Sequence, residues 1–180
     1  MKEEIIIAGF GGQGVLAMGK VLAYTGLLQG LEVSWMPSYG PEQRGGTSNV
    51  TVILSDKRIS SPVLNSFDTA ILLNHPSIER FESKIKSGGT LIYDGTGLKK
   101  HPTRTDINIY RINAAEYANA NNIKTTNMSI LGGLIKVRPI ILAENILKGL
   151  KNTLPERHHH LMPMNENALG IGRVLIQKVE

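Results

Sequence analysis

The sequence predicts an α/β fold, with a single wound, mostly parallel sheet flanked by helices and a helical C-terminal third. Short apolar runs rich in β-branched residues alternate with stretches of helical periodicity over the first two thirds of the chain. A glycine-rich segment joins the first such run to the first helical stretch, and from residue 127 onward the pattern is wholly helical. With 180 residues and no internal repeat or linker, we expect one domain spanning residues 1–180.

The first third predicts a strand, a glycine loop, a helix and a second strand. Residues 5–8 are continuously apolar and mostly β-branched, as in a strand buried on both faces. Apolar residues then recur at helical spacing from Val15 to Leu28, and Gly30 predicts the end of that helix. Residues 31–36 predict the second strand. The segment 37–47 is so rich in glycine and proline that we expect no regular element there.

The remaining elements follow in order. Strands are predicted over 49–54, 67–73 and 90–93, with an edge strand over 107–112, and helices over 77–86 and 113–121. In the last third, Asn127 is predicted to cap a helix that runs to Val137, Pro139 to begin the next, and Asn165 to cap the last, which ends near Val179.

Composition excludes several classes of protein. The chain has no cysteine, which excludes disulfides, thiolate catalysis and iron–sulfur clusters held by this chain. The formal charge of +5 is scattered, without interleaved aromatic residues, so we expect no nucleic-acid partner. No segment approaches the ~20 apolar residues that span a bilayer, and the N-terminus runs directly into a strand. We therefore expect no signal peptide, no membrane contact and a cytoplasmic protein.

The first candidate site is the glycine loop. Gly9, Gly11 and Gly14 fit the pattern G-x-G-x-x-G between a strand and a helix, where backbone N–H groups can approach an anion. A dinucleotide site also needs an acid at the end of the second strand, but Glu32 stands at its start. We therefore favour a tight turn that packs the helix or meets a partner over a nucleotide site.

The second candidate is the loop of residues 38–47, which leaves the carboxyl end of the second strand, where wound sheets bind their ligands. Arg44, followed by Gly45 and Gly46, could hold a phosphate or carboxylate through its guanidinium and backbone N–H groups. The alternative is a surface pair between Arg44 and Glu42 in a flexible loop. Long irregular loops in compact domains tend to be functional, so we expect function here, with partner contact ahead of small-molecule binding.

Two weaker patterns concern metals. Asp94-Gly95 followed by Asn121-Asn122 resembles the motif that holds magnesium and thiamine diphosphate, but its leading glycine is replaced by Tyr93. A turn after a strand explains Asp94 and Gly95 equally well. Adjacent histidines in an extended stretch point to alternate sides, so we expect His158 to His160 to form a polar loop or interface and no metal site.

The two glycine-rich segments together resemble those of the gamma subunits of 2-oxoacid:ferredoxin oxidoreductases. They are Ala8-Gly9-Phe10-Gly11-Gly12-Gln13-Gly14 and Ser38-Tyr39-Gly40-Pro41-Glu42-Gln43-Arg44-Gly45-Gly46-Thr47. The segments 126–132 and 163–169 are similar too, so the resemblance covers essentially the whole chain. Gln43 is a departure, because related chains often carry Met there.

The resemblance implies a subunit rather than a complete enzyme. Such complexes decarboxylate a 2-oxoacid on thiamine diphosphate, pass electrons through iron–sulfur clusters to ferredoxin, and release an acyl-CoA. It implies that thiamine diphosphate, Mg²⁺ and the clusters lie in the partner alpha and beta subunits, or in a ferredoxin-like delta subunit, and that this chain alone is inactive. We expect 2-oxoglutarate as the substrate ahead of pyruvate and branched-chain oxoacids.

The resemblance also implies that coenzyme A contacts both glycine loops. The residues to which this contact carries over are Gly11, Gly12, Gln13, Gly14, Tyr39, Gly40, Arg44, Gly45 and Gly46. Whether Tyr39 packs on the cofactor or on a partner chain stays open at this level. Two alternatives also remain, a stand-alone enzyme that binds a nucleotide on the first glycine loop, and a pure interaction module without a ligand.

Overall fold

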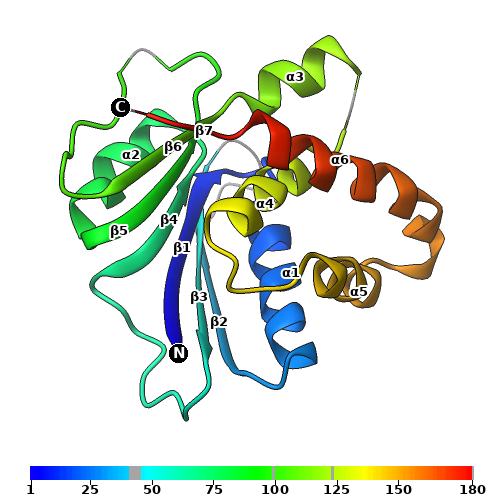
Figure 1. Ribbon diagram of the computed structural model, residues 1–180, viewed down its shortest axis with the longest axis horizontal. Helices are drawn as coiled ribbons and strands as arrows, with labels where there is room; N and C mark the ends of the chain where they lie inside the picture. Colours follow the sequence, from blue (N-terminus) through cyan, green and yellow to red (C-terminus); the bar gives the residue numbers. More distant parts are fainter. Residues whose placement is uncertain (41–45, 99, 123, 180) are drawn as a thin grey trace.

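The computed structural model describes residues 1–40, 46–98, 100–122 and 124–179, and it confirms the predicted α/β class (Figure 1). Its strands are β1 (Lys2–Phe10), β2 (Glu32–Tyr39), β3 (Thr47–Ser55), β4 (Phe67–Leu72), β5 (Ile85–Asp94), β6 (Asn108–Ile112) and β7 (Gln177–Lys178). Its α-helices are α1 (Val15–Leu28), α2 (His75–Phe81), α3 (Ala114–Ala120), α4 (Thr126–Val137), α5 (Ala143–Thr153) and α6 (Met162–Leu175). Two 3-10 helices, Glu82–Lys84 and Glu156–Leu161, complete the described elements.

All the described strands join one sheet in the order β2-β3-β1-β4-β5-β6-β7. The pairs β1/β4, β4/β5 and β5/β6 are parallel, whereas β3 runs antiparallel to both of its neighbours and β7 antiparallel to β6. Five of the seven described strands therefore point the same way. The first helix connects β1 to β2 as predicted, but β3 lies between those two strands.

Both faces of the central strands are buried. Ile5 and Ile7 of β1 join a core covered by α1, α4, α5 and α6, whereas Ile6 and Ala8 face a smaller core closed by α2. Figure 1 shows these four helices on one side of the sheet and α2 on the other. The unbroken β-branched run of β1 thus has the cause inferred from the sequence, since each successive side chain enters a core.

The hairpin of β2 and β3 corrects the predicted loop. Regular pairing continues through Pro37, opposite Val50, to Tyr39, opposite Ser48. A proline cannot donate to a ladder and is accommodated in an edge strand, and β2 is the edge of this sheet. Regular strand pairing therefore extends into the segment that was predicted to be irregular.

Several predicted helix boundaries are wrong for local reasons. The helix predicted over 77–86 begins earlier, because Asn74 caps it by accepting a hydrogen bond from the Ser77 amide (2.9 Å), and β5 already begins at Ile85. Asn127 and Asn165 lie inside α4 and α6 and do not cap them. The fifth helix begins at Ala143 and not at Pro139, and the chain ends its last helix at Leu175 before adding β7 to the predicted edge strand.

Helices α4 and α6 pack through glycines at close range. A Cβ atom on Gly172 would lie 1.7 Å from the carbonyl oxygen of Ser129, and one on Gly132 would lie 2.1 Å from that of Leu169. No side chain fits at either position. The C-terminal third is thus packed backbone to backbone and covers the larger core.

Charged side chains form ion pairs at the end of the sheet where β1 begins. The buried Glu3 carboxylate pairs with Arg138 and accepts a hydrogen bond from the Thr69 hydroxyl (2.6 Å). Lys86 donates to Glu4 (2.6 Å) and to Asp68 (2.7 Å). Burial opposes the charge on Glu4, but hydrogen bonds from Lys2 and Lys86 outweigh it and hold the pKa of Glu4 below its ordinary value. Burial likewise opposes the charge on Lys86, whose pKa is nevertheless raised by Asp68 and Glu4.

Candidate functional site

The glycine loop lies between β1 and α1 at the carboxyl end of the central strands. Gly12 (φ 98°) and Gly14 (φ 78°) adopt left-handed conformations that other residues rarely take. Gln13 holds the loop in place, because its Oε1 accepts from the Phe10 amide (2.6 Å) and its Nε2 donates to the carbonyl of Leu73 (3.2 Å). The loop is therefore tied to the ends of β1 and β4.

No described side chain caps the start of α1, whose first backbone N–H groups lack partners within the helix. Gly14 is its N-cap and supplies no capping side chain, and the first turn carries no acidic residue. The N–H groups at such a helix start carry partial positive charge and can receive an anion. The first-turn residues Val15, Leu16 and Ala17 line a groove, so this helix start borders open space.

The two predicted glycine segments meet across that groove. The Gly11 amide of the first segment donates to the carbonyl of Gly46 in the second (2.9 Å), and within the second segment the Gly40 amide donates to the carbonyl of Thr47 (3.3 Å). Of the nine residues predicted to contact a cofactor, six line the groove, namely Gly11, Gly12, Gly14, Tyr39, Gly40 and Gly46. Gln13 lies on the other side of the loop, and Arg44 and Gly45 fall outside the described residues.

The groove is large and mostly apolar. Its volume is about 980 Å³, and besides the glycines its walls carry Phe10, Val15, Leu16, Ala17, Trp35, Pro37, Thr47 and Ser48. Tyr39 is 70% exposed at its end, and Trp35, the single tryptophan of the chain, is half-exposed in its wall. An apolar wall beside free backbone N–H groups suits a ligand with both an apolar part and an anionic part.

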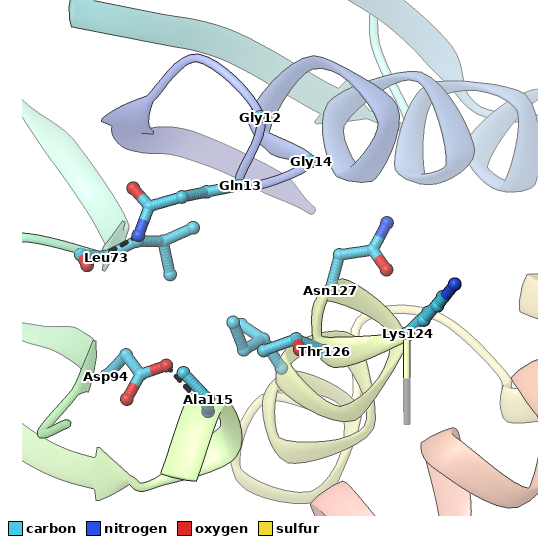
Figure 2. Close-up of a pocket in the computed structure, with 10 residues that line it drawn as sticks. Gly12, Gln13, Gly14, Leu73, Asp94, Ala115, Lys124, Thr126 and Asn127 are labelled. Atoms are coloured by element: carbon cyan, nitrogen blue, oxygen red, sulfur yellow. Dashed lines mark hydrogen bonds between the residues drawn. The ribbon is translucent and has the colours of Figure 1, made fainter. Parts of the chain in front are cut away.

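A second hollow, of about 320 Å³, opens on the opposite side of the glycine loop, where Gly12, Gln13 and Gly14 face the start of α4 (Figure 2). Asn127 lies opposite Gly14, so close that a Cβ atom on this glycine would come within 2.9 Å of it. Lys124 supplies a positive charge at the rim, and α4 has no side-chain cap. The loop therefore separates two hollows.

Asp94 lines the second hollow, but both of its carboxylate oxygens have partners. They accept hydrogen bonds from the amides of Thr96 (2.9 Å) and Ala115 (3.1 Å), which form the turn after β5 and the start of α3. Asn121 donates its side-chain amide to the carbonyl of Tyr117 (2.9 Å) at the end of α3. These bonds agree with the turn interpretation of Asp94, and the residues do not fit a magnesium or thiamine diphosphate site.

The three histidines do not lie in an extended stretch, which corrects the predicted geometry. They belong to the 3-10 helix Glu156–Leu161, and the Nε2 atom of His159 lies 3.0 Å from the carbonyl oxygens of Lys151 and Leu154. Within the part of the chain that the structure describes, no three or more His, Asp or Glu side chains are grouped as metal ligands.

Sequence reasoning missed three residues at these hollows. Trp35 lies on the predicted second strand and is not among the predicted site residues, although its side chain lines the groove. Lys124 and Asn127 lie far along the chain from the glycine loop, and the fold alone brings them to it. The available signal was the helix start predicted near Asn127, which a wound sheet can place at the same edge as the first helix start.

The fold is a wound α/β domain in which a glycine loop separates two hollows. Its sequence matches the family model described as pyruvate ferredoxin/flavodoxin oxidoreductase over residues 4–174. The chain belongs to this family, and within it to the gamma-subunit type of the 2-oxoacid:ferredoxin oxidoreductases.

Two curated relatives differ in length. The 2-oxoglutarate synthase subunit KorC of Methanothermobacter marburgensis is 33% identical over 186 residues, which covers 99% of this chain and 98% of the relative. The ketoisovalerate oxidoreductase subunit VorA of Methanothermobacter thermautotrophicus is 49% identical over 93 residues, or 52% of this chain. That match covers only 20% of the VorA chain, so this chain corresponds to a fraction of its length.

Solved structures share the fold. The 2-oxoglutarate:ferredoxin oxidoreductase of Magnetococcus marinus, solved with 2-oxoglutarate, coenzyme A and succinyl-CoA bound, superposes with a TM-score of 0.86 at 24% identity. The superposition covers 97% of this chain and 31% of that one. The gamma subunit of a keto/oxoacid ferredoxin oxidoreductase from Geobacter sulfurreducens gives a TM-score of 0.82 at 24% identity, covering 97% and 96%.

In the described ranges, no helix combines the length and the apolar character that crossing a membrane requires.

Proposed function

We propose that this chain serves a 2-oxoacid:ferredoxin oxidoreductase as the subunit whose groove contacts coenzyme A. Thiamine diphosphate, Mg²⁺ and iron–sulfur clusters are held by the partner alpha and beta subunits, or by a delta subunit. One observation carries the proposal. The backbone bond from Gly11 to Gly46 joins the two glycine segments, and residues of both line the same groove. In support, the same fold occurs in a relative whose structure holds coenzyme A.

The groove fits the chemistry of coenzyme A. Its phosphates suit the free N–H groups of the glycine loop and the helix start at Val15. Its apolar and adenine parts suit the side chains of Trp35 and Tyr39. When bound, coenzyme A supplies the thiol that accepts the acyl group. The role of this chain is to bind and orient it, because no described side chain in the groove is a carboxylate, a histidine or a lysine.

We propose 2-oxoglutarate as the oxoacid. A relative that is matched over 98% of its own length is a 2-oxoglutarate synthase subunit. The relative with higher identity, the ketoisovalerate subunit, matches only half of this chain. The assignment is tested by the ratio of kcat/KM values of the purified complex for 2-oxoglutarate and for ketoisovalerate, where we expect at least about tenfold in favour of 2-oxoglutarate. A preference for ketoisovalerate would overturn the substrate and leave the subunit assignment intact.

The coenzyme A contact is tested in the complex by replacing Tyr39, which is exposed and outside both cores. We expect Tyr39→Ala to raise the KM for coenzyme A by about tenfold with an unchanged KM for the oxoacid, because a stacking surface is lost. Val174→Ala, at a residue that is 79% exposed on α6, is the matched control and should change neither value. An unchanged KM for coenzyme A in Tyr39→Ala contradicts the contact.

The isolated chain provides a second test. Because Trp35 is the only tryptophan, its fluorescence reports on the groove alone. We expect coenzyme A to quench it saturably and NAD or FAD to leave it unchanged. With an oxoacid, coenzyme A, thiamine diphosphate and ferredoxin, the isolated chain should reduce nothing. Steady ferredoxin reduction by this chain alone would overturn its role as a subunit.

A further inference from the structure

A third hollow lies near the opposite margin of the sheet from the coenzyme A groove. Its volume is about 320 Å³, and it opens at β5, β6 and β7, whereas the groove opens beside β2. It shares no lining residue with either of the hollows around the glycine loop, and it is lined by Tyr93, His101, Arg111, Gln177, Lys178 and Val179. A ligand in this hollow would therefore occupy a site of its own.

Three polar side chains form a row across these strands. Tyr93 of β5 pairs in register with Arg111 of β6, and Arg111 pairs in register with Gln177 of β7. Residues in register on neighbouring strands point to the same face of a sheet, so the phenol, the guanidinium and the carboxamide stand side by side. The row crosses β5 and β6 one residue before their carboxyl ends, which is the edge where wound sheets bind their ligands.

The Tyr93 hydroxyl is a hydrogen-bond donor at this hollow. The residue is only 1% exposed, and its hydroxyl lies 3.3 Å from Nδ1 of His101, whose ring packs edge-on against the phenol at a centroid distance of 6.0 Å. Burial raises the pKa of Tyr93 above its ordinary value of 10.0, and the charge of Arg111 opposes this rise without reversing it. The hydroxyl therefore stays protonated at neutral pH and can donate to His101 or to a ligand.

Arg111 is held in place by its stem and leaves most of its guanidinium available. The stem lies across Gly95, directly after β5, because a Cβ atom on this glycine would come within 2.8 Å of the Arg111 Cδ atom. Within the described chain, the side chain makes one hydrogen bond, from Nη2 to Oε1 of Gln177, and at 3.5 Å it is long. The forked N–H groups of a guanidinium match the paired oxygens of a phosphate or a carboxylate.

The hollow carries positive charge and no described negative charge. None of its lining residues is an acid, and Arg111 and Lys178 both line it. Neither of these two takes part in an ion pair among the described residues, whereas Arg104 and Arg138 each pair with a carboxylate. Cationic groups and a hydroxyl donor around a concave site are complementary to an oxyanion.

We propose that this hollow binds the phosphate or carboxylate group of a small molecule between the Arg111 guanidinium and the Tyr93 hydroxyl. Lys178 adds a second positive charge, and Gln177 borders the bound oxyanion. The volume lies at the lower limit of small-molecule pockets, so the hollow suits a compact anion and not a whole dinucleotide. Because no residue is shared with the groove, the site does not depend on the proposed function.

Titration of the full chain with inorganic phosphate, and separately with succinate, tests the site. Amide NMR shifts are followed at constant ionic strength, which removes the general screening of charge. We expect saturable shifts concentrated at Tyr93, Arg111 and Gln177, with a Kd of about 1 mM or lower for the better probe. The better probe then identifies the ligand group as a phosphate or a carboxylate. Shifts that do not saturate, or that occur at the glycine loop instead, overturn the site.

Two variants and a matched control locate the binding. We expect Arg111→Gln to weaken binding of the better probe by about tenfold or more, because a charge-assisted pair is lost. Tyr93→Phe keeps the buried ring and removes only the hydroxyl, and should weaken binding by about fivefold. Arg173→Gln, at an exposed arginine on α6, should bind as the wild type does. Wild-type affinity in both Arg111→Gln and Tyr93→Phe overturns the site.

Two further measurements test whether a polypeptide occupies the hollow. Glu180 follows Val179 and lies outside the described residues. If the wild type binds neither probe but Glu180→Gln binds phosphate, the occupant is the Glu180 side chain, and the ligand site is overturned. In the purified oxidoreductase complex we expect the affinity of the isolated chain. Loss of binding in the complex shows that a companion chain covers the hollow, and it also overturns the ligand site.

Discussion

The sheet has one edge where its central strands begin and one where they end, and polar groups are paired at the first and left open at the second. At the edge where β1 begins, Glu3 and Glu4 are nearly inaccessible, and the charges of Arg138 and Lys86 pair with them. At the carboxyl edge, the glycine loop and the uncapped start of α1 leave backbone donors facing open hollows. Polar groups that are satisfied within the fold stabilise it, and polar groups left free can bind a ligand. Changes at the first edge should therefore alter stability, and changes at the second should alter binding.

The largest effect should come from removing Arg138. Arg138→Met leaves the buried Glu3 carboxylate with the Thr69 hydroxyl but without a countercharge, and we expect a loss of about 2 to 3 kcal/mol in the free energy of unfolding. Urea denaturation of the isolated chain measures it. In the double variant Glu3→Gln with Arg138→Met the loss should be smaller, because no buried charge remains. Equal losses in the two variants would show that the ion pair contributes nothing at this edge.

At the open edge, Gly12→Ala should affect binding more than folding. Its Cβ atom would meet nothing within 4 Å, but the left-handed backbone makes alanine cost about 1 kcal/mol of stability. Gly30→Ala is the matched control, since Gly30 is also left-handed and free of neighbours but lies beyond the end of α1. We expect both variants to lose the same stability, and Gly12→Ala alone to raise the KM for coenzyme A in the complex by about tenfold. Equal KM values would exclude the loop from binding.

The smallest effect concerns Lys86, whose ammonium group is partly exposed. Because the pKa of Glu4 is lowered in the fold, its pairing contributes stability above the ordinary pKa of 4.5, and this contribution is lost as the pH falls through the lowered pKa. The raised pKa of Lys86 extends the contribution to pH values beyond 10.5. Lys86→Met should therefore destabilise by up to about 1 kcal/mol at pH of about 7 and by less at pH of about 3. Melting temperatures at the two values test this, and a difference that does not depend on pH would contradict it.

The parts of the fold that sequence predicts are those whose cause is local. The run Ile5-Ile6-Ile7-Ala8 predicts a strand buried on both faces whatever its neighbours are, and the structure confirms it. The continuation of β2 through Pro37 depends on that strand being the edge of the sheet, which is a tertiary fact. Asn165 marks a helix start by its residue type, but its side chain donates to the carbonyl of Leu161 within a helix that began three residues earlier.

In the candidate site too, the features with a local cause could be predicted from the sequence, and those that depend on the fold could not. Glycines at 11, 12 and 14 predict a backbone that can approach a ligand, because no other residue adopts such turns as readily. That both glycine segments would serve one ligand was implied by the family resemblance and not by spacing, and the bond from Gly11 to Gly46 was not predicted. Lys124 could not be predicted as a site residue. It lies more than a hundred residues after the glycine loop, and only the folded chain brings the two to the same hollow.

The interlocked helices α4 and α6 have a practical corollary. The Ser129 carbonyl occupies the position that a methyl group on Gly172 would take, so α6 cannot rotate about its axis relative to α4. The segment after α6 is thereby directed to β6, with which β7 pairs. Strand β6 and its partner stand at the opposite margin of the sheet from β2. An affinity handle or a fluorescent reporter fused after Glu180 would consequently follow β7 on the side remote from the groove, and the coenzyme A assays above can be run on a tagged protein.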